Sequence, residues 1–179
     1  MATAINASYF TGKIFLPNTA TTYSEGQQLL TFINQFEPIF LEKVFGVQMA
    51  TLVQGEIDTP ANVNLAKIVN GTIYTDWAGK QQKWVGLKNT ALLSPVANYV
   101  YYQVQQVRDT SSTGIGEMMQ QTENATRTNA GPKTTMAWNQ MVDWLLKLDE
   151  FIEVSSSVSE FSTYNPDLEM FTFTTRFGL

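Results

Sequence analysis

SEGQQLLTFINQFEPIFLEKVFG, residues 24–46, is the stretch of this chain that most strongly indicates its fold. Its opening Ser24-Glu25-Gly26-Gln27 is typical of a helix capping box, and Gly46 is placed to end the helix. Pro38 predicts either a kink or a second helix that begins after Glu37. Apolar residues between these ends recur every three or four positions, which predicts an amphipathic helix: Leu29, Leu30, Ile33, Phe36, Phe40, Leu41 and Val44.

Two later stretches have the same spacing. The first, from about Lys88 to Arg108, predicts a long helix whose apolar surface is widened by Tyr99, Tyr101 and Tyr102. The second predicts a last helix from about Lys133 to Val154, with a buried stripe at Trp138, Met141, Leu145, Leu148 and Ile152. Trp144 and Phe151 lie off that stripe, so they are candidates to face a neighbouring subunit.

The stretches between these helices predict smaller elements. Asp58-Thr59-Pro60 predicts a capped helix start before the buried residues Leu65, Ile68 and Val69. A change of period over Thr72–Val85 predicts a small hairpin. The remaining predictions are a strand at Lys13–Leu16, a short helix at Val47–Leu52 that stops before Gly55, a loop over Asp109–Gly114 and a partly helical segment around Glu117–Ala125.

The C-terminal residues alternate between apolar and polar from Glu169 to Phe177, after a Ser-rich linker that begins at Ser155. Alternation predicts a strand, which either forms an edge of this domain or adds to a sheet of another subunit. The predicted fold is mainly α: a bundle of about four to five helices with a small β-hairpin and an extended C-terminal strand or arm. The predicted parts are an N-terminal extended segment, 1–23, a helical domain, 24–154, and the linker with its arm, 155–179.

The composition excludes several kinds of site, because the 179 residues include no cysteine and no histidine. Disulfides, Cys/His zinc sites and thiol or Ser–His nucleophiles are therefore excluded. We predict no cofactor and no metal. Charged residues make up only 15 % of the chain, whereas Thr, Ser, Asn and Gln together number 57. A polar surface with few charges and many aromatic residues favours a protein that is in contact with other proteins.

The net charge of −5 comes entirely from the last 40 residues, which contain seven acids and two bases. Residues 1–139 are neutral overall, so the chain is poorly suited to grip nucleic acid, which needs Lys and Arg. The start of the chain predicts neither a signal peptide nor an anchor, and Thr90–Val107 is too polar for a membrane span.

Carboxylate pairs offer an enzymatic alternative, because glycosides can be hydrolysed without histidine. The candidates are Asp149 with Glu150, and Glu117 with Glu123. Adjacent residues on a helix point in different directions, and Glu117 and Glu123 lie in a polar loop. A solvated acidic face is therefore favoured over a hydrolase.

Several short motifs follow one another along the chain: Phe36-Glu37-Pro38-x-Phe40-Leu41-x-Lys43-x-Phe45-Gly46, Trp84-Val85-Gly86-Leu87-Lys88, Ala97-Asn98-Tyr99-Val100-Tyr101-Tyr102, Gly114-x-Gly116-Glu117, Glu123-Asn124-Ala125 and Ala137-Trp138-Asn139-Gln140-Met141-Val142. Taken in this order, they resemble head–tail connector (adaptor) proteins of tailed bacteriophages that infect Bacteroides-like gut bacteria, a group that includes crAss-like phages. The resemblance spans about Ser24–Val154, and its order and spacing matter more than any one motif.

The resemblance implies a structural, non-enzymatic subunit of the virion, made in the host cytoplasm and placed at the head–tail interface. It implies a ring, commonly of twelve copies, that contacts itself, the portal protein and the next tail or neck ring, and that DNA only passes through. Another virion structural protein, for tail completion or associated with the capsid, is the alternative. Candidate interface residues are Phe171, Phe173, Arg176, Phe177, Trp144 and Phe151; candidate acidic residues facing the channel are Asp143, Asp149, Glu150 and Glu153.

Overall fold

A computed structural model describes residues 2–109, 111–113, 116–118 and 131–174. Within these residues it has five α-helices, two antiparallel hairpins and four short 3₁₀ turns, so the mainly helical fold with a small hairpin is confirmed. The helices are α1 (Ser24–Phe45), α2 (Val47–Asp58), α3 (Val63–Asn70), α4 (Pro95–Asp109) and α5 (Gly131–Val154). The strands are β1 (Thr72–Thr75), β2 (Gln81–Trp84), β3 (Ser111–Thr113) and β4 (Gly116–Met118).

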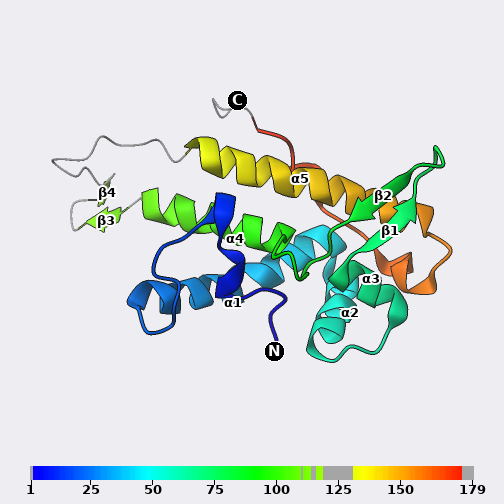
Figure 1. Ribbon diagram of the computed structural model, residues 1–179, viewed down its shortest axis with the longest axis horizontal. Coiled ribbons are helices and arrows are strands. Elements are labelled where there is room, and N and C mark those ends of the chain that lie inside the picture. The colour runs from blue at the N-terminus through cyan, green and yellow to red at the C-terminus, as the bar shows by residue number, and fades with distance from the viewer. Residues whose placement is uncertain (1, 110, 114–115, 119–130, 175–179) are drawn as a thin grey trace.

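The three long helices form one layer, in which α4 lies between α1 and α5 (Figure 1). α2 packs against α1 and α3, and β2 packs against α5. The core is formed by apolar side chains from every one of these helices, and its largest fully buried members include Phe40, Phe45, Met49, Ile68, Trp84 and Met141. No helix among the described residues has the combination of length and apolar character that crossing a membrane requires.

Helix α1 follows the apolar stripe that the sequence predicts, but its start differs. Ser24 is the first helical residue and its hydroxyl hydrogen-bonds to the Glu25 side chain, so the predicted capping box is wrong. The helix continues through Pro38 without a second start. Gly46 ends it with φ of 74°, a conformation that favours glycine.

The two helices after α1 have different limits from those predicted. α2 continues past Leu52 and through Gly55 to Asp58, because a single glycine lowers helix stability by only about 1 kcal/mol. Asp58 therefore ends α2 instead of capping α3. The N-cap of α3 is Asn62, whose side-chain oxygen accepts hydrogen bonds from the N–H groups of Asn64 and Leu65 at 2.8 and 3.1 Å.

Helix α4 begins at Pro95, seven residues later than Lys88, where the sequence analysis places its start. The side-chain amide of Asn89 hydrogen-bonds to backbone groups of Val85 and Leu93 and holds the connection as a loop. The Ser94 hydroxyl accepts a 3.4 Å hydrogen bond from the Ala97 N–H, which is an N-cap contact. Ser94 followed by Pro95 is thus the helix start that the apolar spacing of Leu92 and Leu93 concealed.

The two hairpins follow α3 and α4 in the chain. β1 and β2 confirm the predicted hairpin, with Ile73 opposite Lys83 and Tyr74 opposite Gln82. β3 and β4 pair immediately after α4, where the sequence analysis predicts a loop and then a partly helical segment. Residues 119–130 lie outside the described residues.

The two ends of the chain contain 3₁₀ turns where strands are predicted. Lys13 belongs to the turn Gly12–Ile14, so the strand at Lys13–Leu16 is wrong. Near the other end, Leu168–Met170 is a 3₁₀ turn and Phe171–Thr174 pairs with no strand of the described residues, so the predicted edge strand of this domain is wrong there. Pairing of this stretch with another subunit stays a prediction. Residues 175–177 of the predicted strand lie outside the described residues.

Residues 155–174, which we call the C-terminal strap, cross the helical layer instead of forming a free linker and arm (Figure 1). The N–H groups of Asn165 and Asp167 donate to the carbonyl oxygens of Phe45 and Lys43 on α1. Phe171 then packs against Phe40, Tyr99 and Trp138, which belong to α1, α4 and α5.

Candidate functional site

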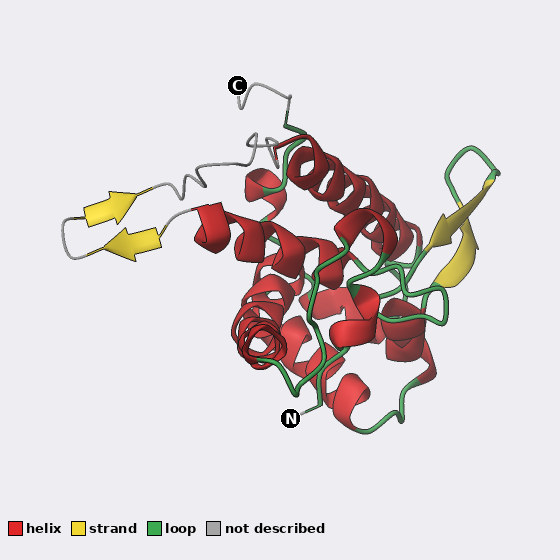
Figure 2. Ribbon diagram, turned by 60° about the vertical axis from the view of Figure 1, so that its left-hand side comes forward, coloured by secondary structure: helices red, strands yellow, loops and turns green. Residues whose placement is uncertain are grey.

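The hairpin of β1 and β2 projects from the helical body at one end of α5 (Figure 2). Two buried aromatic residues hold its base. The Trp84 indole N–H donates to the Ile68 carbonyl of α3 at 2.8 Å, and the Tyr74 hydroxyl lies 2.6 Å from Glu150 Oε2 on α5. Burial, and then the hydrogen bond to the Glu150 carboxylate, raise the pKa of Tyr74, so its hydroxyl stays protonated as a donor. The hairpin is thus anchored to two helices.

Two glycines allow the backbone to close at this base. Gly71 has φ of 86°, and a Cβ there would lie 2.7 Å from the carbonyl oxygens of Trp84 and Val85. Gly86 has φ of 88°, and a Cβ there would lie 2.5 Å from the Gly71 nitrogen. Neither position can accept a side chain without movement of the backbone. This accounts physically for the Trp84-Val85-Gly86-Leu87 motif.

The turn of the hairpin is held in one conformation by Asp76. Its Oδ1 accepts from the N–H groups of Ala78 and Lys80 at 2.9 and 2.8 Å, and its Oδ2 accepts from the Gln82 side chain at 2.9 Å. These hydrogen bonds, from Gln82 first, lower the pKa of Asp76. Trp77 follows directly and is 72 % exposed, and Ile73 on the outer side is 65 % exposed. A fixed turn therefore presents an indole ring to the surroundings.

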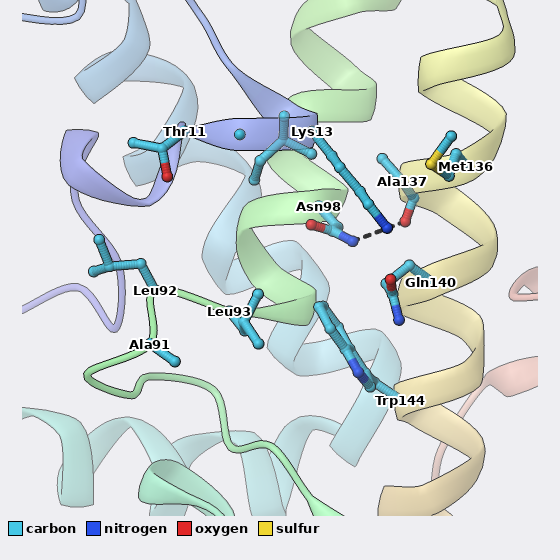
Figure 3. Close-up of a pocket in the computed structure, with 12 residues that line it drawn as sticks. Thr11, Lys13, Ala91, Leu92, Leu93, Asn98, Met136, Ala137, Gln140 and Trp144 are labelled. Atoms are coloured by element: carbon cyan, nitrogen blue, oxygen red, sulfur yellow. Dashed lines mark hydrogen bonds between the residues drawn. The ribbon is translucent and has the colours of Figure 1, made fainter.

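A second feature is an apolar pocket of about 250 Å³ between residues 11–14, the 91–93 loop, α4 and α5. We call it the α5 pocket. Its walls include Leu93 and Met136, which are about half exposed, and Trp144, which is buried. Figure 3 shows the Lys13 side chain reaching across the pocket toward Ala137. Among the described residues, Lys13 is the only charged one that lines it.

The predicted interface residues occupy three different situations. Phe151 is buried against Tyr74 and Phe161, and Phe171 of the strap is buried against the helices, so these two rings belong to the interior of this subunit. Trp144 is also buried, although it borders the α5 pocket. Phe173 is exposed. Arg176 and Phe177 lie outside the described residues.

The predicted acidic residues of α5 mostly have partners within the subunit. Asp149 accepts a 2.9 Å hydrogen bond from the Tyr164 hydroxyl of the strap, and Glu150 accepts one from Tyr74 of the hairpin. Asp143 lies 3.5 Å from the Lys147 ammonium, and Glu153 is exposed. Asp149 and Glu150 thus attach two separate segments to one helix, which is a structural use of the pair proposed for hydrolysis.

The other carboxylate pair lies outside the described parts of the chain, which include neither the side chain of Glu117 nor any of Glu123. In those parts of the chain, no three Asp or Glu side chains are gathered in a way that could hold a metal ion. The described side chains of the hairpin and the pocket offer apolar surface and lysine ammonium groups: Lys80 and Lys83 on the hairpin and Lys13 in the pocket.

The sequence analysis missed a buried carboxylate, Glu37, which is only 1 % exposed. Its Oε1 accepts a 2.7 Å hydrogen bond from the Ala4 N–H and so attaches the start of the chain to α1. Burial raises the pKa of Glu37 to about 7, against the lowering effect of the Ala4 and Ile5 N–H groups and of Lys88. The sequence feature that could have identified Glu37 as buried is its position in the apolar stripe of α1, four residues after Ile33 and three before Phe40.

The strap is held by hydrogen bonds from two side chains of α5, which were also not predicted from the sequence. The Asn139 side chain donates to the Thr174 carbonyl and accepts from the Thr174 N–H, both at 2.9 Å. The Trp138 indole N–H donates to the Thr172 carbonyl at 2.8 Å. Two side chains of α5 therefore bind the backbone of the strap much as a neighbouring strand would.

Comparison with known proteins gives no match of any kind: no protein family, no curated protein and no solved structure is similar to this chain.

Proposed function

We propose that this chain is a subunit of a ring-shaped head–tail connector of a tailed bacteriophage, placed between the portal and the tail. The resemblance described above, over residues 24–154, suggests the assembly. The observation that carries the proposal is the β1–β2 hairpin, a rigid projection that exposes Trp77 and Ile73. Tryptophan is prominent among residues that contribute most to protein–protein binding, so the hairpin is a docking element.

In this proposal the acidic C-terminal region lines the channel, where negative charge keeps the wall from gripping DNA. Exposed Glu153 is the candidate best placed for this, because Asp149 and Glu150 accept hydrogen bonds from tyrosines and Asp143 is paired with Lys147. A ring structure in which these acids lie on the outer wall would contradict the assignment.

The test is negative-stain microscopy and native mass spectrometry of the purified protein, with and without the portal protein of the same virus. We expect rings of about twelve copies that are coaxial with the portal, formed either alone or on it. A protein that stays monomeric and does not bind the portal under both conditions contradicts the proposal. Binding elsewhere on the particle would favour a tail-completion or capsid-associated protein instead.

A further inference from the structure

Two pockets of the subunit meet at the loop of residues 89–93. The α5 pocket borders this loop, and a second pocket of about 350 Å³ lies between the loop and the base of the β1–β2 hairpin. Ala91 and Leu93 line both pockets, which together we call the basic groove. We propose that the basic groove binds a short acidic peptide segment of a partner protein, in which apolar side chains lie between two carboxylates. This inference goes beyond the proposed function, because it does not depend on ring formation.

Each pocket of the basic groove contains one cation. Lys13 lines the α5 pocket, where its side chain reaches across toward Ala137 (Figure 3), and Lys83 of β2 lines the second pocket. Neither ammonium group has an ion pair or a hydrogen bond with another side chain in the part of the chain that the structure describes. No acid is among the described residues that line either pocket. The groove therefore offers two cations to the carboxylates of a ligand.

The acids of the hairpin and of the neighbouring part of α5 already have partners within the subunit. Asp76 accepts three hydrogen bonds from groups of the hairpin itself. Asp143 forms an ion pair within α5, and Glu150 accepts the hydrogen bond of the Tyr74 hydroxyl. Lys80, in the turn of the hairpin, is exposed and adds a further cation to that element. The charges that the groove offers to a ligand are thus positive, which favours an acidic partner.

The apolar part of the lining fits a peptide better than a nucleic acid. Leu93 and Met136 are about half exposed, and Ile73 on the hairpin is mostly exposed. Apolar side chains of a peptide can cover this surface and remove it from water. The aromatic residues of the lining, Trp84 and Trp144, are buried, so among the described lining residues no ring is open for a base to stack on.

The loop between the two pockets is held in one conformation. Leu92 has φ of 56°, which is unusual for a residue with a bulky side chain. The Asn89 side chain hydrogen-bonds to backbone groups of Val85 and Leu93, and the Tyr9 hydroxyl hydrogen-bonds to the backbone of Asn89. Strained backbone of this kind is concentrated at sites that bind ligands, and a preformed site loses less entropy on binding. The groove is therefore preformed.

The first test measures the binding of fluorescent peptides by fluorescence polarisation at low salt. The probe is a pool of hexapeptides with Asp or Glu at the second and fifth positions and Leu, Ile, Val or Met between them. A twin pool carries Asn or Gln in place of the acids. We expect the acidic pool to bind wild type at least ~10-fold more tightly than the twin pool, and to lose this preference in ~0.5 M salt. Equal binding of the two pools, or no binding of the acidic pool up to ~1 mM protein, would overturn the inference.

The second test locates the acidic pool on the protein. Lys13→Glu and Lys83→Glu should each weaken its binding about tenfold, because each variant replaces an attraction by a repulsion. Lys67→Glu is the matched control, since Lys67 is an exposed lysine of α3 outside both pockets and the variant has the same net charge. It should bind the pool as wild type does. Unchanged binding in the two groove variants, or equal losses in all three, would overturn the site.

The third test concerns the apolar contact at Leu93, which lines both pockets. Leu93→Gln should weaken binding of the acidic pool at least ~5-fold, because a polar side chain cannot replace the lost apolar contact. Leu146→Gln changes a similarly exposed residue of α5 outside the groove and should have no effect. Circular dichroism checks that both variants fold. Equal binding by the two variants would overturn the role of the apolar lining.

A single-stranded oligonucleotide with the same label is measured beside the peptides. If it binds more tightly than the acidic pool and loses binding in the same lysine variants, the groove binds nucleic acid and the peptide proposal is overturned. Weaker binding of the oligonucleotide supports the peptide. These measurements do not depend on ring formation, so their failure would leave the connector function standing.

Discussion

The two ends of the described chain cross the same layer of helices, but they are attached in different ways. The N-terminal segment, residues 2–16, contacts α1 through its first 3₁₀ turn and α5 through its second. The C-terminal strap also passes from α1 to α5, and it lies behind α5 in Figure 1, whereas the N-terminal segment crosses in front. Neither contains a strand or an α-helix within the described residues.

The two ends differ in the number of side chains that each buries in the core. The N-terminal segment buries six side chains in the core: Ala4, Ile5, Tyr9, Phe10, Ile14 and Leu16. The strap buries Phe161 and Phe171, and α5 holds its last residues through their backbone. We infer that the first segment is part of the cooperative core, while the end of the strap can detach with the helices intact.

The largest expected effect is at Phe10, which is 1 % exposed. Phe10→Ala should lower the free energy of unfolding by about 3–5 kcal/mol, because it leaves a cavity that the helices cannot fill. Urea unfolding measures this change. Phe15→Ala in the same segment removes an exposed ring and should cost less than about 0.5 kcal/mol. Similar losses for both variants would show that the segment is not part of the core.

The next effect concerns Glu37, whose pKa is about 7 in the folded protein against an ordinary value of 4.5. Between these values the folded protein keeps a proton that the unfolded chain has released. Raising the pH from 5 to 8 should therefore lower the free energy of unfolding of wild type by up to about 3 kcal/mol. In Glu37→Gln this contribution disappears, so the variant should gain most over wild type at pH 8.

Urea unfolding at a series of pH values between 5 and 8 measures the two curves. Glu42→Gln removes a carboxylate from the exposed side of the same helix and should follow the wild-type curve. A wild-type stability that rises over this range, or that runs parallel to Glu37→Gln, would contradict the assignment. It would also mean that the hydrogen bond to Ala4 compensates for the burial of the charge.

The smallest expected effect is at Asn139. Asn139→Ala removes both backbone hydrogen bonds to Thr174, so amide hydrogen exchange at Thr174 should become roughly tenfold faster, equivalent to about 1.4 kcal/mol of local stability. Global unfolding should change by less than that. Asp143→Asn, one turn later, alters an exposed ion pair of little energetic value and serves as control. Unchanged exchange in Asn139→Ala would show that Trp138 and Phe171 hold the end of the strap without Asn139.

The helices were predictable because their signals are local. The apolar spacing in residues 24–46 and 133–154 identifies α1 and α5 and most of their buried residues. Helix ends were less predictable, because Leu92 and Leu93 continue the spacing of α4 upstream of its first residue, Pro95. The Ser94–Pro95 pair was the better guide to that end.

The prediction of a C-terminal edge strand failed for a different physical reason. Alternation of Phe171 and Phe173 with polar residues indicates an extended backbone, but it does not indicate which groups bind that backbone. Here the backbone of the strap is bound by the side chains of Trp138 and Asn139, which lie more than 30 residues earlier in the chain. No local sequence pattern predicts these contacts. The α5 pocket was unpredictable for the same reason, since it joins residues 11–14 to α5 across the fold.

The contacts of Trp138 and Asn139 with the strap also affect which amino-acid substitutions the strap can tolerate. The Trp138 indole binds a backbone carbonyl group, and the Asn139 amide binds a backbone carbonyl and a backbone N–H group. Every residue other than proline has both of these backbone groups. The identities of Thr172, Phe173 and Thr174 are therefore irrelevant to these hydrogen bonds. Mutations can accumulate along this stretch and change what it displays to the outside, while Phe171 and the two α5 side chains keep it in place.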